Sequence, residues 1–363
     1  MGSDDRLRQR QARVYNRARR RLSWADTLAG LVALVAVVVW AGALGGWGCV
    51  AALAAVLPAI SLPFGYAGYV LSRRNGLSRQ TPGGWLADQG KARAVGLLLG
   101  ALVALGPLGI QRLFPAWWPV PSWAAAVMVA ALLSVLWPVV LLPIFMRSEP
   151  LADGPLAEAL WETVRATGVP VRDMRLLHMG EKTSAANAMV AGMGPTLRVY
   201  VGDTIGEQAD PELALTDTRL VLAHELGHHA HGDTWRLMAW SAVALAAGMA
   251  GAWIGVRELS PDGAGHLTAL PSLVLGFSLA SAALSPAGAA FSRRLERAAD
   301  AYAVRVTGQG ARYAETFERL VEQNLMELEP PHLWHTLTAS HPMPAERIAT
   351  ARRNVTGREP RQE

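Results

Sequence analysis

The residues best able to do chemistry in this chain lie in one short stretch, His224-Glu225-Leu226-Gly227-His228. Two histidines four positions apart share one face of a helix and can bind a single metal ion. A glutamate beside the first of them can take the proton of a water molecule that the metal polarises. This H-E-x-x-H pattern is typical of zinc-dependent peptide hydrolysis. It arises by chance in about one unrelated chain of this length per hundred, so the rest of the sequence has to support it.

A catalytic zinc site needs a third protein ligand, and the candidate lies in the segment 292–300 (SRRLERAAD). Glu296 and Asp300 are four residues apart, so both can face one site from the same helix. Glu296 can bind zinc, and Asp300 can accept the free ring N–H of a ligand histidine and thereby fix its tautomer. Taken alone, a segment with such charges is more often a solvated helix face.

The composition indicates a protein that meets lipid. The chain is 51% hydrophobic and 17% charged, and it contains 13 tryptophans. Its net charge of +5 comes from clustered arginines, and no RNA-recognition motif accompanies it, so no nucleic-acid partner is expected. The single cysteine, Cys49, excludes an intramolecular disulfide and is expected to pack in a core.

Six apolar stretches are long enough to cross a bilayer, at about 20 residues per pass. The first uncharged run can cross twice, with a glycine-rich turn at 45–48. The predicted spans lie within 27–72 (two spans), 94–111, 123–146, 237–256 and 267–290. Buried helices of a soluble protein would be shorter or would carry a polar face.

Arginine placement predicts the orientation. Basic residues gather in the N-terminal tail, in the connection 73–93, at Arg147 and from Arg293 onward. The opposite turns carry few charges, namely Arg112, Arg257, Glu258 and Asp262. By the positive-inside rule, both termini and the H-E-x-x-H segment face the cytoplasm of a cell membrane, which an even number of spans permits.

We therefore expect a mainly α-helical membrane protein with six transmembrane helices and a cytoplasmic α+β catalytic domain. The segments with mixed polarity predict a helix at 156–167, strands at 174–179 and 197–201, and an edge strand within 184–192. Thr216 or Asp217 is expected to cap the helix of the H-E-x-x-H motif. The predicted divisions are a basic tail (1–23), four spans (24–146), a catalytic part (147–236), spans five and six (237–291) and a C-terminal catalytic part (292–363).

The membrane spans can bring the two halves of the site together. If the zinc helix continues straight into span five, His228 lies roughly 14 Å from the start of that span. Glu296 follows span six by about one and a half turns. Because a short loop joins spans five and six, their cytoplasmic ends should be neighbours.

These motifs resemble the M48 family of integral-membrane zinc metallopeptidases, which includes the Ste24-type CAAX prenyl protease and the HtpX protease. The resemblance rests on HELGHHAHGD (224–233) followed, after two apolar spans, by SRRLERAAD. Residues 187–192 resemble the family's N-A-x-x-x-G segment, and 340–348 its late H-P…R-I motif. Residues 76–91 are similar to the Ste24-type N-terminal membrane region. The chain is shorter than Ste24 enzymes, which typically have a seventh span and a large enclosed chamber.

The resemblance implies a zincin-like (gluzincin) catalytic domain that binds one Zn2+ per chain through His224, His228 and Glu296. It implies that Glu225 is the general base, and that Asn187 lies on an edge strand that pairs with an extended substrate. His341 could stabilise the oxyanion of the tetrahedral intermediate. Asp233 is expected to be a cap or an ion-pair partner rather than a ligand.

The function expected is that of a membrane-embedded zinc endopeptidase acting on peptide or protein substrates anchored in the lipid bilayer. Two substrate classes stay open: lipidated CAAX-like proteins, suggested by the Ste24-type N-terminal region, and damaged membrane proteins, suggested by the HtpX-like core. The Arg- and Ala-rich composition is typical of high-GC bacterial chains, where prenylated proteins are not expected, and favours the second class slightly. The alternative from another class is a catalytically silent membrane scaffold that retains the zinc fold. The oligomeric state is left open.

Overall fold

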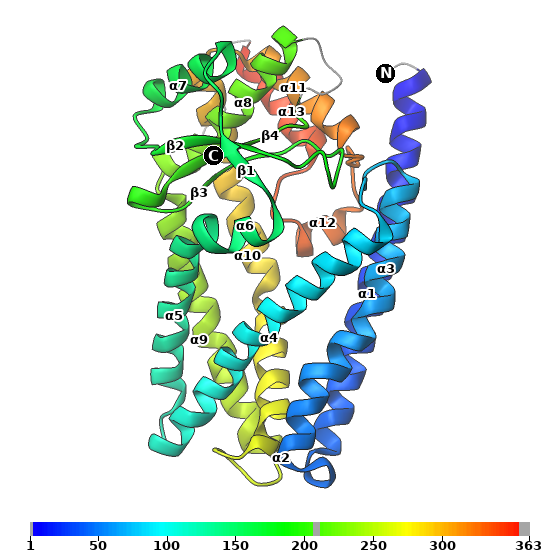
Figure 1. Ribbon diagram of the computed structural model, residues 1–363, viewed down its shortest axis with the longest axis vertical. Coiled ribbons are helices and arrows are strands. Elements are labelled where there is room, and N and C mark those ends of the chain that lie inside the picture. The colour runs from blue at the N-terminus through cyan, green and yellow to red at the C-terminus, as the bar shows by residue number, and fades with distance from the viewer. Residues whose placement is uncertain (1–2, 206–210, 356–363) are drawn as a thin grey trace.

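The computed structural model describes residues 3–205 and 211–355, as a tall bundle of long helices topped by a smaller α/β cap (Figure 1). Among the described residues, six helical segments are long and apolar enough to cross a membrane, which confirms the predicted number of spans. They are built from α1 (Ser3–Val39), α2 (Ala41–Ala51) with α3 (Leu57–Arg74), α4 (Pro82–Leu113), α5 (Pro119–Leu136) with α6 (Leu142–Phe145), α9 (Asp233–Leu259) and α10 (Leu270–Thr307).

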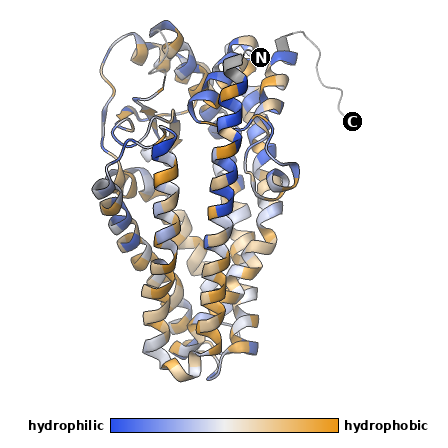
Figure 2. Cartoon of the chain, turned by 90° about the vertical axis from the view of Figure 1, so that its right-hand side faces the viewer, coloured by the Kyte–Doolittle hydropathy of each residue, from blue (hydrophilic) through white to orange (hydrophobic). Residues whose placement is uncertain are grey.

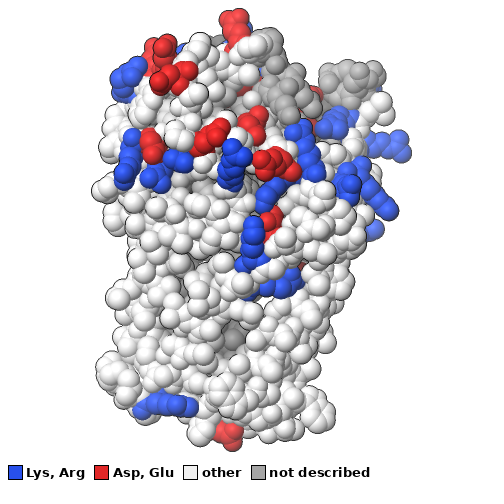
Figure 3. All heavy atoms as spheres, in the orientation of Figure 1, with Lys and Arg blue, Asp and Glu red and all other residues white. Residues whose placement is uncertain are grey.

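The polar and apolar parts of the molecule are segregated along its long axis. The lower part of the bundle is predominantly apolar, whereas hydrophilic residues gather toward the cap (Figure 2). On the face drawn in Figure 3, charged side chains crowd the upper part, and a broad uncharged belt separates them from a few charges at the bottom. An uncharged belt of this kind is what a lipid-facing surface requires.

Several helices extend beyond the predicted apolar spans. The basic N-terminal segment is not a separate tail but continues into the first span as the single helix α1. Part of the polar connection 73–93 is also helical, because α4 begins at Pro82, where Thr81 accepts the capping bond from the Gly84 N–H at 3.1 Å. The predicted turn at 45–48 coincides with a kink at Gly45, whose φ is 68°.

The cap contains a four-stranded sheet with the strand order β1-β2-β4-β3. Its strands are β1 (Ser148–Pro150), β2 (Asp173–Leu177), β3 (Ala188–Ala191) and β4 (Arg198–Gly202). The three predicted strands are present within a few residues of their expected bounds, and β3 lies at an edge, as predicted. The short β1, which contains Pro150, was not predicted. Only β2 and β4 run parallel.

Helix α8 (Pro211–Ala230) carries the H-E-x-x-H motif through the middle of the cap. Leu222 and Leu226 pack against the sheet and against α7 (Pro155–Thr167). Leu220 and Ala223 pack on another side against α10, α11 (Gly310–Gln323) and α13 (Pro344–Val355). This burial on two sides fixes the direction in which the motif points.

Two expectations about α8 are wrong. Thr216 and Asp217 do not cap the helix, because both lie inside it, and Asp217 is instead buried in an ion pair with Arg319. The zinc helix also does not continue straight into span five. The chain turns at His231 and Gly232, the latter with φ 68°, before α9 begins at Asp233.

The pairing of α9 with α10 brings the two halves of the site together, as the span argument predicted. The two helices approach so closely that a Cβ on Gly251 would lie 2.3 Å from the carbonyl oxygen of Gly276. Side chains larger than hydrogen would separate them. α10 then extends upward past the end of α9 and packs beside α8 (Figure 1).

Candidate active site

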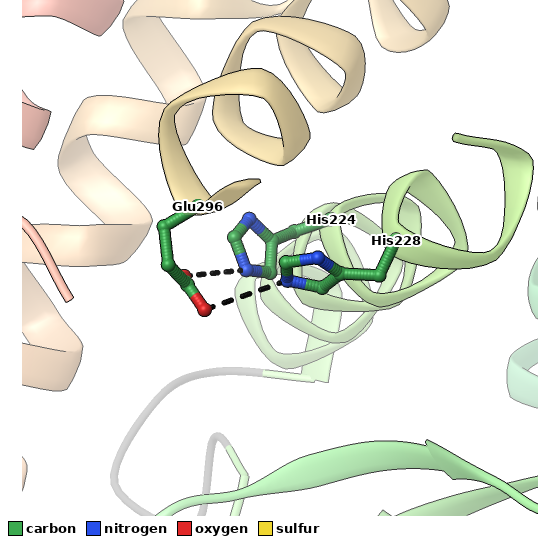
Figure 4. Close-up of side chains that lie close together, drawn as sticks. All are labelled: His224, His228 and Glu296. Carbon is green, nitrogen blue, oxygen red and sulfur yellow. Dashed lines mark ion pairs between the residues drawn. The ribbon is translucent and has the colours of Figure 1, made fainter. Parts of the chain in front are cut away.

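The three predicted zinc ligands converge, although they come from two distant segments. Glu296 of α10 faces His224 and His228 of α8 (Figure 4). Its Oε2 lies 3.3 Å from Nε2 of His224, and its Oε1 lies 3.5 Å from Nε2 of His228. One ligand atom from each of the three residues falls within 4.8 Å of the others.

The arrangement fits a bound metal ion. Two neutral imidazole nitrogens and one carboxylate oxygen form the donor set of many catalytic zinc sites, which leave a fourth position open. Oε2 of Glu296 is buried and accepts no hydrogen bond from any described residue, despite its closeness to His224. A buried carboxylate oxygen without a donor needs another positive partner, and a cation between these atoms would supply it.

A carboxylate behind each histidine fixes the ring orientation. Nδ1 of His224 lies 2.9 Å from Oδ1 of Asp300. Nδ1 of His228 lies 2.9 Å from Oδ2 of the fully buried Asp233. In both cases a proton on Nδ1 leaves Nε2 free to bind the metal. The turn at Gly232 is what places Asp233 beside the histidine that precedes it by five residues.

Asp300 is itself held by two residues whose roles the sequence reasoning did not foresee. Arg347 of α13 donates two hydrogen bonds to its oxygens, at 2.8 and 2.6 Å. Tyr313 of α11 donates to Oδ1 at 2.5 Å and also contacts Nδ1 of His224 at 3.2 Å. Arg347 belongs to the H-P…R-I motif and could have been noticed from it, whereas no sequence motif includes Tyr313.

Removing the Arg347 guanidinium should weaken zinc binding. We expect Arg347→Met to lower the zinc affinity of the folded protein by about 10- to 100-fold, because Asp300 would no longer be held against His224. Chelator competition measures this affinity. The matched control is Arg352→Met, since Arg352 pairs with Glu318 at the surface of the same helix. Equal zinc affinities in both variants would contradict the prediction.

The metal-free site should hold a proton on His224. Burial alone lowers the pKa of this histidine, but the closely approaching carboxylates of Asp300 and Glu296 raise it to about 9. Zinc must displace that proton, so its affinity should fall by up to about tenfold per pH unit below that pKa and level off above it. Chelator competition from about pH 6 to about pH 10 tests this, and a flat profile across that range would contradict it.

The remaining predicted residues line one cavity of about 240 Å³ beside the metal ligands. Glu225 opens onto it, and burial raises the pKa of its carboxyl. Asn187 lies one residue before β3, and His341 places Nε2 at 3.3 Å from Oε1 of Glu296. His335 of α12 (His332–Thr338), to which no role was given, bonds through Nε2 to the carbonyl oxygen of His341 at 2.9 Å and so supports that loop.

The comparisons with known proteins agree with this geometry. The family model described as "Peptidase family M48" matches residues 150–355, more than half of the chain. This chain belongs to peptidase family M48. The model "CAAX prenyl protease N-terminal, five membrane helices" matches residues 6–147, a range in which the structure has four helical segments that could cross a membrane.

Individual relatives span most of this M48 chain. An uncharacterized metalloprotease, YhfN of Bacillus subtilis, is 28% identical over 316 residues, which is 84% of this chain and 72% of the relative. A CAAX prenyl protease 1 homolog of Arabidopsis thaliana is 24% identical over 300 residues, covering 79% and 68% of the two chains. The crystal structure of S. mikatae Ste24p superposes with a TM-score of 0.78 at 21% identity, covering 95% and 88%. The chain is therefore a metalloendopeptidase of this family, with the fold of Ste24p.

Proposed function

We propose that this chain is a zinc-dependent endopeptidase that cleaves membrane-associated or lipidated proteins at the cytoplasmic face of the membrane. The observation that carries the proposal is the convergence of His224, His228 and Glu296, with Glu225 opening onto the adjoining cavity. The site lies just above the paired helices α9 and α10, so that substrates anchored in the bilayer are within reach.

In the proposed mechanism, zinc would polarise the attacking water and the scissile carbonyl. Glu225 takes the proton of that water and returns it to the leaving amine. His341 donates a hydrogen bond to the developing oxyanion. Asp300 and Asp233 keep both ligand histidines in the tautomer that presents Nε2.

The edge of β3 offers the place for the substrate backbone. In the antiparallel pair of β3 with β4, alternate residues turn their N–H and C=O groups away from β4. The Gly202 N–H donates to the Asn187 carbonyl, so Asn187 faces β4 and Ala188 faces outward. Ala188 lines the same cavity as His224 and Glu225. An extended peptide paired with β3 would pass Asn187 and bring one of its carbonyls to the site.

A cavity of about 890 Å³ where the membrane helices meet the cap favours lipidated proteins among the two substrate classes. It is lined by residues of α1, α3, α4 and α6, by Trp137 between α5 and α6, and by the chain that enters β3; its aromatic lining includes Phe64, Tyr69 and Trp85. The relatives named CAAX prenyl protease support the same reading. Comparing the cleavage of a prenylated peptide with that of its unlipidated twin separates this class from cleavage of damaged membrane proteins.

The orientation rests on charge. α1 begins at the same end of the molecule as the cap (Figure 1), and the charged side chains of Figure 3 crowd that end. The positive-inside rule then supports a cytoplasmic site. Cysteine labelling from each side of intact cells tests it, with a cysteine placed at Ser3 and another at Asp262, both in a Cys49→Ala background.

The catalytic proposal is tested with purified protein in detergent. Peptidase activity should disappear on chelation and return with added zinc. Zinc binding without hydrolysis of any peptide in a diverse library would instead favour the membrane scaffold.

A further inference from the structure

The free edge of β3 ends just before the strand begins, because a side chain occupies the backbone groups of the chain that leads into it. Ala186 lies two residues before Ala188, just outside β3, and by the alternation of an extended chain its backbone groups also face away from β4. Its N–H donates to Oδ1 of Asn324 at 2.9 Å, and its carbonyl accepts from Nδ2 of Asn324 at 3.1 Å. The carboxamide thus makes both hydrogen bonds that a neighbouring strand would make.

We propose that Asn324 ends the β-ladder between substrate and β3, and so fixes how far a substrate pairs on one side of the scissile bond. This inference rests on the proposed function, in which the substrate pairs with β3. A peptide can take the outward groups of Ala188, but at Ala186 it meets an edge that is already satisfied. The position at which the peptide would next pair is Ala186, two residues before Ala188, and Asn324 already occupies both of its backbone groups.

The position of Asn324 suits such a role. Its side chain lines both the cavity of the metal site and the larger cavity among the membrane helices. A substrate that extends past Ala188 therefore leaves the sheet where the two cavities meet. Asn324 is a positioning residue, because it contacts neither the metal ligands nor Glu225 in the described hydrogen bonds and acts through the strand.

The turn that carries Asn324 is held firmly. Leu325 has φ 49°, the only positive φ of a non-glycine residue in the part of the chain that is described. Such a conformation persists only where its surroundings enforce it. Here Asn16 of α1 donates to the Leu325 carbonyl at 2.8 Å, and Gln9 donates to that of Met326 at 3.2 Å. The first membrane helix therefore fixes the end of the ladder.

Gln323, the neighbour of Asn324, provides the matched control. Its Nε2 donates to the carbonyls of Ser184 and Thr204, both at 2.9 Å. It secures the same segment without contacting either backbone group of Ala186 in the described hydrogen bonds. Gln323→Ala should loosen this segment but leave the ladder end in place, whereas Asn324→Ala frees both groups of Ala186.

The experiment measures binding rather than turnover, in the full chain loaded with zinc and carrying Glu225→Gln. Fluorescein-labelled alanine-rich peptides are lengthened one residue at a time at either end, and their affinities are measured by anisotropy. With Asn324 present, each residue added at one end of the peptide should raise the affinity only until a peptide residue pairs with Ala188. Further residues at that end should add nothing. With Asn324→Ala, two further residues should add about fivefold, from the new pair of hydrogen bonds. Gln323→Ala should keep the original limit.

The inference would be overturned by an unchanged limit in Asn324→Ala, by a uniform loss of affinity at all lengths, or by the same shift in Gln323→Ala. A peptide affinity that does not depend on length at either end would also overturn it, because no ladder would then exist. If the proposed function is wrong, the chain with Glu225 intact will not hydrolyse peptides. The length limit on peptide binding can still be measured in that case, because the binding experiment does not depend on hydrolysis.

Discussion

Replacing Glu225 with glutamine is expected to lower kcat/KM for peptide hydrolysis by on the order of 10³-fold, within the range that general-base catalysis contributes. Glutamine has nearly the same shape but cannot take a proton, so the attacking water would lose its base. Glu225 belongs to the cavity rather than to the group of metal ligands, so the zinc content should stay at one ion per chain. Activity assays and metal analysis on the same preparation measure the two effects.

The control for this prediction is Glu181→Gln, which makes the same chemical change at an exposed position of the cap. It should retain full activity. If Glu225→Gln kept more than a tenth of the activity with zinc bound, another group would have to serve as the base.

Glu296→Gln should reduce zinc affinity by more than about 100-fold, which exceeds the effect of changing a residue behind the ligands. The amide is a weaker donor than the carboxylate and leaves the charge of the ion less compensated. Activity should fall in proportion to zinc occupancy and should recover in part at high zinc concentration. The recovery distinguishes a lost ligand from a lost base, since added zinc cannot rescue Glu225→Gln.

The comparison variant is Glu346→Gln, because Glu346 of α13 pairs at the surface with Arg297, the residue that follows Glu296 in α10. This change should leave zinc affinity within about twofold, as expected for an exposed ion pair. Zinc affinity in Glu296→Gln equal to that of this control would rule out Glu296 as the third ligand.

The histidine pair could be predicted from the sequence alone because helical periodicity is local. Residues four apart face the same direction wherever the helix lies, so His224 and His228 had to converge. The apolar spans are likewise a property of consecutive residues, since the bilayer sets their length directly. The pairing of spans five and six through a short loop was enough to bring Glu296 to the histidines.

Other contacts depended on segments that meet only in the folded chain. Arg347 and Tyr313 reach Asp300 from two further helices, and no spacing in the sequence relates them to it. The turn at Gly232 was missed, because a straight helix was expected to run on into span five. That turn places Asp233 behind His228.

The sequence by itself predicted the candidate ligands and the candidate base, and it determined the number of segments long and apolar enough to cross a membrane, because each depends on residue type and on local period. Only the tertiary structure decided what holds those groups in place: the carboxylate behind His228, the arginine and tyrosine behind Asp300, and the Asn324 side chain at the end of β3. The contact of Asp233 with His228 follows from the turn at Gly232, whereas the others join residues distant in the chain, and their geometry follows from how the helices pack rather than from any local pattern.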